Sequence, residues 1–211
     1  IDVLQLSSAQ SVTELIEYLK GSDLYDVLYR VSQYANAGLL DYETSLDLYY
    51  FQSFWKARKR VMSDEDLKVM TEVYGKKIDL LNMQWIVRSK KNFHLNPNEI
   101  YSLIIPIQYK LKPAEFNAMV EADSVETLSQ LIAGSYYGRE IGNLNAGTVE
   151  DTYLKLQYDV NIKACNLHPY SVAMINSYLY CKERERNRLI TAAECIRYKM
   201  DFDTTLSYIT K

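Results

Sequence analysis

The 211-residue chain has the composition of an ordinary globular protein, with 48% hydrophobic and 24% charged residues. Its net charge of −3 offers no basic surface of the kind that nucleic-acid binding requires, and no apolar run approaches the ~18 residues that cross a bilayer. Seven glycines and four prolines are too few for a turn-rich β sandwich and favour long helices. Three cysteines without a CxxC pair fit a reducing compartment, so we expect a cytoplasmic protein.

Helix signals begin close to the start of the chain. Ser11, with Glu14 three residues later, forms a capping box, and Gly21 supplies the helix stop. Residues 23–37 indicate a second helix, ended by the glycine that follows. Residues 41–62 place apolar and aromatic side chains at helical spacing and predict a third helix.

The longest amphipathic segment follows. Ser63 and Asp66 form another capping box, and apolar residues then recur every three or four positions, which predicts one helix over 63–91. Gly75 within it costs ~1 kcal/mol relative to alanine, so it indicates close packing or a bend. The Asn-Pro-Asn-Glu segment that begins at residue 96 predicts a shorter helix to about residue 111.

A second round of helices begins after Pro113. Residues 114–122 are predicted to be helical, and Ser124 caps the next helix. Residues 142–147 indicate a turn, after which Thr148 is predicted to cap a helix that continues to about residue 165.

Pro169 is predicted to occupy the first position of the last long helix, of about thirty residues. No segment alternates in the manner of a β-strand, so the fold class is all-α. The predicted buried stripe of the last long helix consists of Val172, Ile175, Leu179, Leu189, Ala193 and Ile196.

The chain repeats itself at long range. The capping segment 11–22 returns at 124–135, and Asn82 returns as Asn187. The helix with Asp47 and Tyr49 similarly returns with Asp151 and Tyr153. A period near 100 residues is too long for stacked solenoid repeats. We therefore expect two similar multi-helix units, 1–112 and 113–211.

Two helical segments carry a family resemblance. Residues 75–88 resemble the "D-x-x-N … R" helix of the C subunit of the archaeal and bacterial A/V-type rotary ATPases, which corresponds to the d subunit of the vacuolar enzymes. Residues 178–187 are similar to the "Y-L-x-x-K-E-x-E-x-x-N" helix of the same family, and the resemblance covers nearly the whole chain. The residues that match these motifs, taken as structural, are Asp79, Asn82, Arg88, Lys182, Glu183, Glu185 and Asn187.

The resemblance implies a pseudo-symmetric funnel of three helical units, and the two copies found here would be a funnel that lacks one unit. It also implies a non-catalytic rotor subunit that joins the central stalk to the membrane proteolipid ring. A protein with this role lies on the cytoplasmic face of the membrane as a peripheral part of the complex. The alternative is a helical adaptor with an unrelated protein partner.

The residues themselves leave the role of the charged run 182–188 open. It could be a solvated face with ordinary pairs one turn apart, a polar network between helices, or a surface for a partner protein. Lys182 and Arg186 lie within the predicted apolar stripe and would interrupt a packed seam.

No residues indicate catalysis. His94 and His168 are the only histidines, and neither has the companions that a zinc site or a Cys/His nucleophile needs. The phosphate-binding motifs GxxxxGK[ST] and GxGxxG are missing. We therefore predict no catalytic, metal or cofactor site and no small-molecule substrate. An all-α enzyme would need a pocket that joins a histidine with carboxylates.

Overall fold

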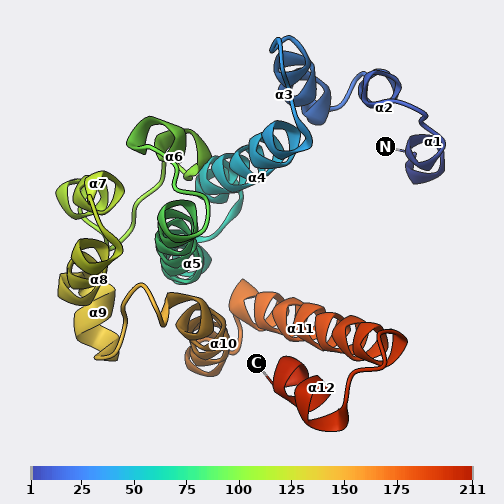
Figure 1. Ribbon diagram of the computed structural model, residues 1–211. Helices are drawn as coiled ribbons and strands as arrows, with labels where there is room; N and C mark the ends of the chain where they lie inside the picture. Colours follow the sequence, from blue (N-terminus) through green and yellow to red (C-terminus); the bar gives the residue numbers. More distant parts are fainter. Residues whose placement is uncertain (1, 211) are drawn as a thin grey trace. The chain divides into compact units, whose positions relative to one another are not determined.

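The computed structural model describes residues 2–210, which form twelve α-helices and no strand (Figure 1). The predicted all-α fold is confirmed. The chain divides into two compact units, Ile1–Arg60 and Val61–Lys211. The helices are α1 (Val3–Ser7), α2 (Val12–Tyr18), α3 (Asp23–Ser32), α4 (Leu39–Val61), α5 (Asp64–Lys91), α6 (Pro97–Leu103), α7 (Pro113–Glu121), α8 (Val125–Gly134), α9 (Tyr136–Ile141), α10 (Val149–Leu167), α11 (Val172–Arg197) and α12 (Phe202–Ile209).

The two capping segments of the predicted repeat adopt the same local structure. Ser11 has φ −147° and ψ 159°, and Ser124 has φ −140° and ψ 160°. Each hydroxyl accepts from the N–H group three residues later. The compact units divide the chain at a different place from the predicted boundary at 112/113. The repeat of whole units therefore stays a prediction.

The first unit has a small core of its own, made by Ile16, Leu19 and Leu28 with flanking side chains from α1 to α4. The helix predicted over 23–37 is shorter than expected, because α3 ends at Ser32. The next N–H groups bond only three residues back, as in the bond from Tyr34 N to Val31 O of 3.0 Å. The helix predicted over 41–62 is confirmed by α4.

The second unit is organised around α5, which has 28 residues and begins at the predicted cap. The Ser63 hydroxyl accepts from the backbone N–H of Asp66 at 3.2 Å. The main core lies on α5 and α6 to α10 and includes Met83, Ile86 and Ile100, which have no exposed surface.

Gly75 marks a close approach between α5 and another segment. A Cβ atom at this position would lie 2.8 Å from the Cβ of Tyr109, well inside van der Waals contact. Glycine is therefore required where the segment after α6 crosses α5. The prediction of close packing is confirmed.

The helix predicted from residue 96 to about 111 is only partly correct. α6 begins at the predicted cap, where the structure shows a capping box: the Asn96 side chain accepts from Glu99 N, and the Glu99 carboxylate accepts from Asn96 N. It ends at Leu103, and residues 104–112 are irregular. Side chains of α5 hydrogen-bond to the backbone of this segment and replace the helical bonds, as described below.

The helix that follows Pro113 and the helix capped by Ser124 are confirmed as α7 and α8. Thr148 precedes α10 as predicted, but its hydroxyl does not cap the helix. It donates instead to Asn143 O at 2.7 Å and accepts from Asn145 N at 3.1 Å, so it stabilises the preceding turn.

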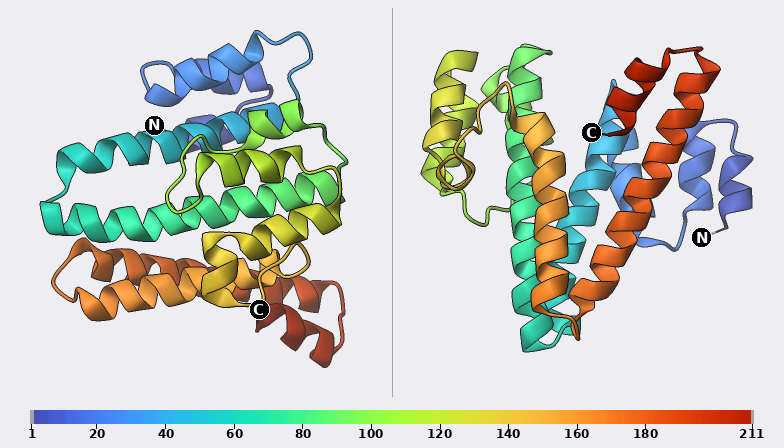
Figure 2. Two further views of the ribbon diagram at one scale, coloured as in Figure 1. Left: turned by 90° about the vertical axis from the view of Figure 1, so that its left-hand side faces the viewer. Right: turned by 90° about the horizontal axis from the view of Figure 1, so that it is seen from below.

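The long helices α10 and α11 pack against each other and against α5. They form a V that opens away from their connecting turn, with α12 packed on α11 (Figure 2). Pro169 lies in that turn and not at the first helical position, so this prediction was wrong. Ser171 caps α11 instead, by accepting from Ala173 N at 3.2 Å.

The predicted buried stripe of α11 is also wrong. Ala173, Ser177 and Cys195 form the buried side of this helix, and the predicted stripe lies on the opposite side. Lys182 and Arg186 fall within that stripe, which explains why it is not packed. We call the apolar part of this surface the α11 outer face: Ile175, Leu179, Leu189 and Ile196, which are 60–73% exposed.

Candidate functional site

Asn82 joins α5 to the irregular segment that follows α6. Its side-chain amide donates to Ile105 O at 2.9 Å and more weakly to Ile107 O at 3.4 Å, and its oxygen accepts from Ile105 N at 2.9 Å. Both Asn82 and Ile105 have no exposed surface. One side chain therefore bonds both backbone polar groups of a buried residue that lies outside any helix.

Asp79 lies one turn before Asn82 on α5 and holds the end of the same segment. Its carboxylate accepts from the N–H groups of Tyr109 at 2.9 Å, Lys110 at 2.6 Å and Leu111 at 3.1 Å. The hydroxyl of Tyr137, on α9, donates to the same carboxylate at 2.9 Å. Three consecutive peptide N–H groups and one side chain thus converge on Asp79.

The two partners of this contact influence each other's titration. Burial raises the pKa of the Asp79 carboxyl, and the hydrogen bonds from the backbone and Tyr137 oppose that shift. Burial also raises the pKa of the Tyr137 phenol, and the nearby Asp79 carboxylate raises it further. The phenol therefore remains protonated and acts as a hydrogen-bond donor. We call Asp79, Asn82 and Tyr137 the α5 polar anchor.

Two cations of α5 make further contacts. Arg88 Nε donates to Glu150 Oε1 on α10 at 2.6 Å, with both side chains nearly half exposed. Such an exposed pair contributes ~0–1 kcal/mol. Lys90 Nζ donates to Ala122 O at the end of α7 at 2.8 Å. The matched residues of α5 therefore all make contacts outside their own helix.

The matched residues of α11 have a different environment. Lys182 pairs with Glu185 at 2.7 Å, and Arg186 lies 3.7 Å from Glu183, so both pairs are within the helix. Asn187 is exposed, whereas Asn82, its predicted counterpart, is fully buried. The structure thus brings Asp79 and Asn82 together around one segment and leaves Lys182 to Asn187 on the surface.

A second polar junction, between α5, α10 and α11, was not anticipated. Asn176 Nδ2 donates to Asn161 Oδ1 at 2.7 Å and Ser177 Oγ donates to Asn161 O at 2.6 Å. The Tyr74 hydroxyl reaches Asn176 Oδ1 at 3.3 Å. The one sequence feature that could have indicated this junction is Asn161, a polar residue at a core-facing position of a predicted helix. Its partners Asn176 and Ser177 lie on another helix, and local periodicity does not identify contacts between helices.

Within residues 2–210, no group of three or more His, Cys, Asp or Glu side chains is arranged to hold a metal ion. His168 ends α10, with its Nδ1 3.5 Å from Glu65 Oε1, and His94 lies in the loop after α5. None of the helices in the described part combines the length and apolar composition that a membrane span requires.

Comparison with known proteins gives a consistent result. The family described as "ATP synthase (C/AC39) subunit" matches residues 1–208. Similar relatives include the C subunit of the A-type ATP synthase of Methanobrevibacter smithii, 28% identical over 64% of this chain and 35% of the relative. The corresponding proteins from Thermococcus kodakarensis and Methanothermobacter thermautotrophicus are 28% and 25% identical, over 89% and 91% of this chain and 51% and 52% of the relatives.

The chain thus spans about half the length, or less, of the curated relatives it matches. The match runs through α5 and α11, which carry the motif residues, and it confirms the resemblance to the C subunit of the A/V-type rotary ATPases. The chain belongs to the ATP synthase (C/AC39) subunit family.

Proposed function

We propose that this chain is part of a non-catalytic central-rotor subunit of an A/V-type ATP synthase or ATPase. The subunit sits on the cytoplasmic end of the membrane proteolipid ring, as a peripheral part of the complex. It receives the foot of the central stalk and transmits rotation between the stalk and the ring. Its partners are proteins of the same complex, and it needs no cofactor or small-molecule substrate.

The relatives support this proposal, because each is named as the C subunit of an A-type ATP synthase. The buried polar contacts of the second unit support it as well. A part that transmits torque has to resist bending, and fully satisfied buried polar contacts rigidify a helical body. The α5 polar anchor and the junction at Asn161 are contacts of this kind.

The α11 outer face is the observation that best supports a role in an assembly. Ile175, Leu179, Leu189 and Ile196 are 60–73% exposed on one side of a single helix. Apolar side chains exposed together on one side of a helix often mark a protein interface. The cations Lys182 and Arg186 lie within the same stripe and add charge that a partner can recognise.

The proposal can be tested with the full-length protein and its purified candidate partners. Tagged protein is incubated separately with the proteins of the central stalk and with the detergent-solubilised proteolipid ring. We expect both to be retained on the affinity resin under conditions in which the complex assembles. Retention of neither would contradict the proposal and favour a helical adaptor with another partner. The catalytic subunits of the complex serve as a negative control in the same experiment.

A further inference from the structure

The exposed side of α11 follows a seven-residue repeat. From Val172 to Ile196 its residues are separated alternately by three and four positions, which is the spacing of the a and d positions of a coiled coil. We call this set the α11 seam. It contains the α11 outer face and, at its centre, two cations. Its members are Val172, Ile175, Leu179, Lys182, Arg186, Leu189, Ala193 and Ile196.

The α11 seam is open to solvent along its whole length. Its large apolar side chains are 38–73% exposed, and Ala193, Lys182 and Arg186 are exposed as well. At 1.5 Å per residue the seam is roughly 36 Å long. An α-helix is the element that fits such a surface, because a second helix repeats its side chains at the same interval and can pack against the seam throughout.

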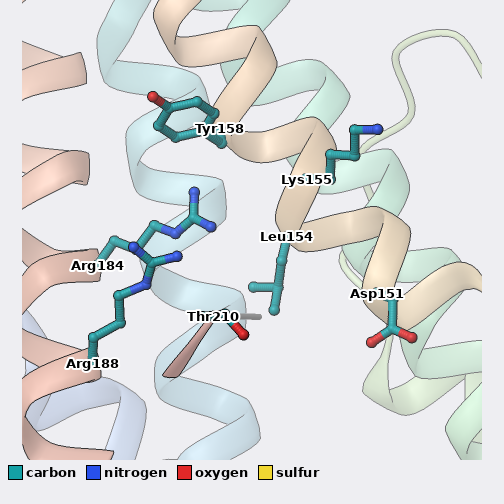
Figure 3. A pocket seen from close by; sticks show the side chains of 7 residues that line it. All are labelled: Asp151, Leu154, Lys155, Tyr158, Arg184, Arg188 and Thr210. Atoms are coloured by element: carbon teal, nitrogen blue, oxygen red, sulfur yellow. The ribbon is translucent and has the colours of Figure 1, made fainter. Parts of the chain in front are cut away.

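The opposite side of α11 already has its contacts within the chain. Figure 3 shows Arg184 and Arg188 projecting from α11 toward α10. The guanidinium carbon of Arg184 lies 4.9 Å from the centroid of the Tyr158 ring on α10. These two arginines therefore belong to the inner side of the helix, and the cations of the seam are Lys182 and Arg186.

The seam carries positive charge at its centre and negative charge along its edges. Lys182 pairs with Glu185 at 2.7 Å, and Arg186 lies 3.7 Å from Glu183, so each cation has a partner on its own helix. Glu183 and Glu185 occupy the e and g positions, which flank the seam of a coiled coil. A helix laid on the seam would take water from the two cations and leave the glutamates at the rim. Because a covered cation needs acceptors in place of water, that helix has to supply carboxylates at its own centre.

A second copy of this chain does not meet this requirement. An antiparallel copy that sets Leu179 against Leu189 also sets Lys182 against Arg186, and a parallel copy in register sets each cation against its own equivalent. Shifting either arrangement by one heptad places the cations against apolar residues instead. Both outcomes are unfavourable at covered seam positions, so charge complementarity favours a different protein.

A lipid surface fits poorly as well. Helices that lie on membranes carry their cations on the polar face, whereas Lys182 and Arg186 lie in the middle of the apolar stripe. The carboxylates of Glu183 and Glu185 lie beside them and would repel anionic headgroups.

We propose that the α11 seam is one half of a two-helix coiled coil, completed by an α-helix of another protein of the complex. That helix carries apolar residues opposite the two ends of the seam, carboxylates opposite Lys182 and Arg186, and cations facing Glu183 and Glu185. The charges fix its register, because a slip along the seam separates these pairs. The inference rests on the proposed function for the source of the partner, and it adds the kind of surface that the partner presents.

The surface can be tested with the full-length protein and a synthetic helical peptide as the probe. The peptide has the length of the seam, with leucine at its outer seam positions, glutamate at the two central seam positions and lysine at the positions that flank them. The control peptide has the same composition with the glutamates and lysines exchanged. Fluorescence anisotropy should show saturable binding of the first peptide, ~10-fold or more tighter than binding of the control peptide.

Substitutions connect this preference to the seam. The double variant Lys182→Glu/Arg186→Glu should reverse it, so that the control peptide binds more tightly. The matched control Lys155→Glu/Lys163→Glu makes the same charge change at exposed positions of α10 and should keep each affinity within about twofold. If the first variant fails to fold, Lys182→Gln/Arg186→Gln takes its place, and the two peptides should then bind within about threefold of each other.

Photo-cross-linking in the intact complex identifies the partner. Benzoylphenylalanine is introduced in place of Leu179 or of Leu189, at the two ends of the charged centre of the seam. Both positions should cross-link to one helix of one partner protein, at sites about ten residues apart, since two packed helices rise equally per residue. Carboxylates should lie between those two sites.

Equal affinity of the unsubstituted protein for the two peptides, or no binding of either, would overturn the proposal. Cross-links to a second copy of this chain or to lipid would overturn it as well. The peptide experiment needs no other protein of the complex, so its result is independent of the proposed rotor function. Failure of that function is recognised separately, by the lack of binding to the proteins of the stalk and the ring.

Discussion

Replacing Asn82 by alanine tests the α5 polar anchor most cleanly, because Asn82 is uncharged and has no exposed surface. The change removes the acceptor of Ile105 N–H, a buried donor whose loss costs ~1–3 kcal/mol. It also removes the 2.9 Å bond to Ile105 O, worth ~0.5–1.5 kcal/mol. The Ile105 carbonyl still accepts a hydrogen bond from Ile107 N at 2.8 Å, so the substitution does not leave this carbonyl without a donor.

The gain in helix propensity from asparagine to alanine returns up to ~0.7 kcal/mol. The net expectation for Asn82→Ala is therefore a loss of about 2–3 kcal/mol in the free energy of unfolding. For a unit of this size, such a loss lowers the melting temperature by roughly 4–12 °C.

The assay is urea unfolding followed by tryptophan fluorescence. The chain has two tryptophans, and only Trp85 lies in the second unit, three residues after Asn82 on α5. A Trp55→Phe background therefore reports on this unit alone. The control is Asn117→Ala, at an exposed position of α7, for which we expect a change within ~0.5 kcal/mol. An Asn82→Ala loss no larger than that of the control would refute the role assigned to the anchor.

Three further predictions concern α5 and α11. Gly75→Ala should lower the melting temperature by several degrees, because overpacking costs ~1–3 kcal/mol and outweighs the helix-propensity gain; Gly134→Ala, which meets nothing within 4 Å, should not lower it. Burial lowers the pKa of the Lys77 amine, so the unfolded chain binds more protons. Stability should rise with pH between that lowered pKa and 10.5, and Lys77→Met should flatten this rise in urea titrations. Leu179→Glu should leave stability unchanged but weaken pull-down of the rotor partners ~10-fold, whereas Phe93→Glu should not.

Each of these has a contrary outcome. An equal effect of the two glycine substitutions would remove the steric explanation for Gly75. A pH slope that persists in Lys77→Met would assign the titration to another group. Undiminished pull-down with Leu179→Glu would show that the α11 outer face is not the interface.

The sequence was sufficient to predict features that depend on near neighbours. The caps at Ser11, Ser63 and Ser124 and the extent of α5 were all predicted, because hydroxyl spacing and apolar periodicity act within a few turns. Of the two interpretations given for Gly75, close packing or a bend, the first is confirmed. These signals are local, and the local structure follows them.

Features set by distant contacts could not be predicted. Residues 104–112 were expected to be helical, but side chains 23 to 32 positions earlier hold their backbone. Similar residue spacings led to the same structural interpretation for the pair Asp79 and Asn82 and for the charged run of α11. The pair is buried, whereas the charged run is exposed. Periodicity locates an apolar stripe, but it does not say whether another element covers that stripe.

Cross-linking mass spectrometry of the intact ATP synthase complex would test the central proposal most directly. Lysine-reactive linkers can be applied to the assembled complex, with Lys182 beside the α11 outer face and Lys155 on α10 as the informative positions. The rotor assignment predicts cross-links from these lysines to proteins of the central stalk or the proteolipid ring. Cross-links confined to the catalytic head or the peripheral stalk would contradict it.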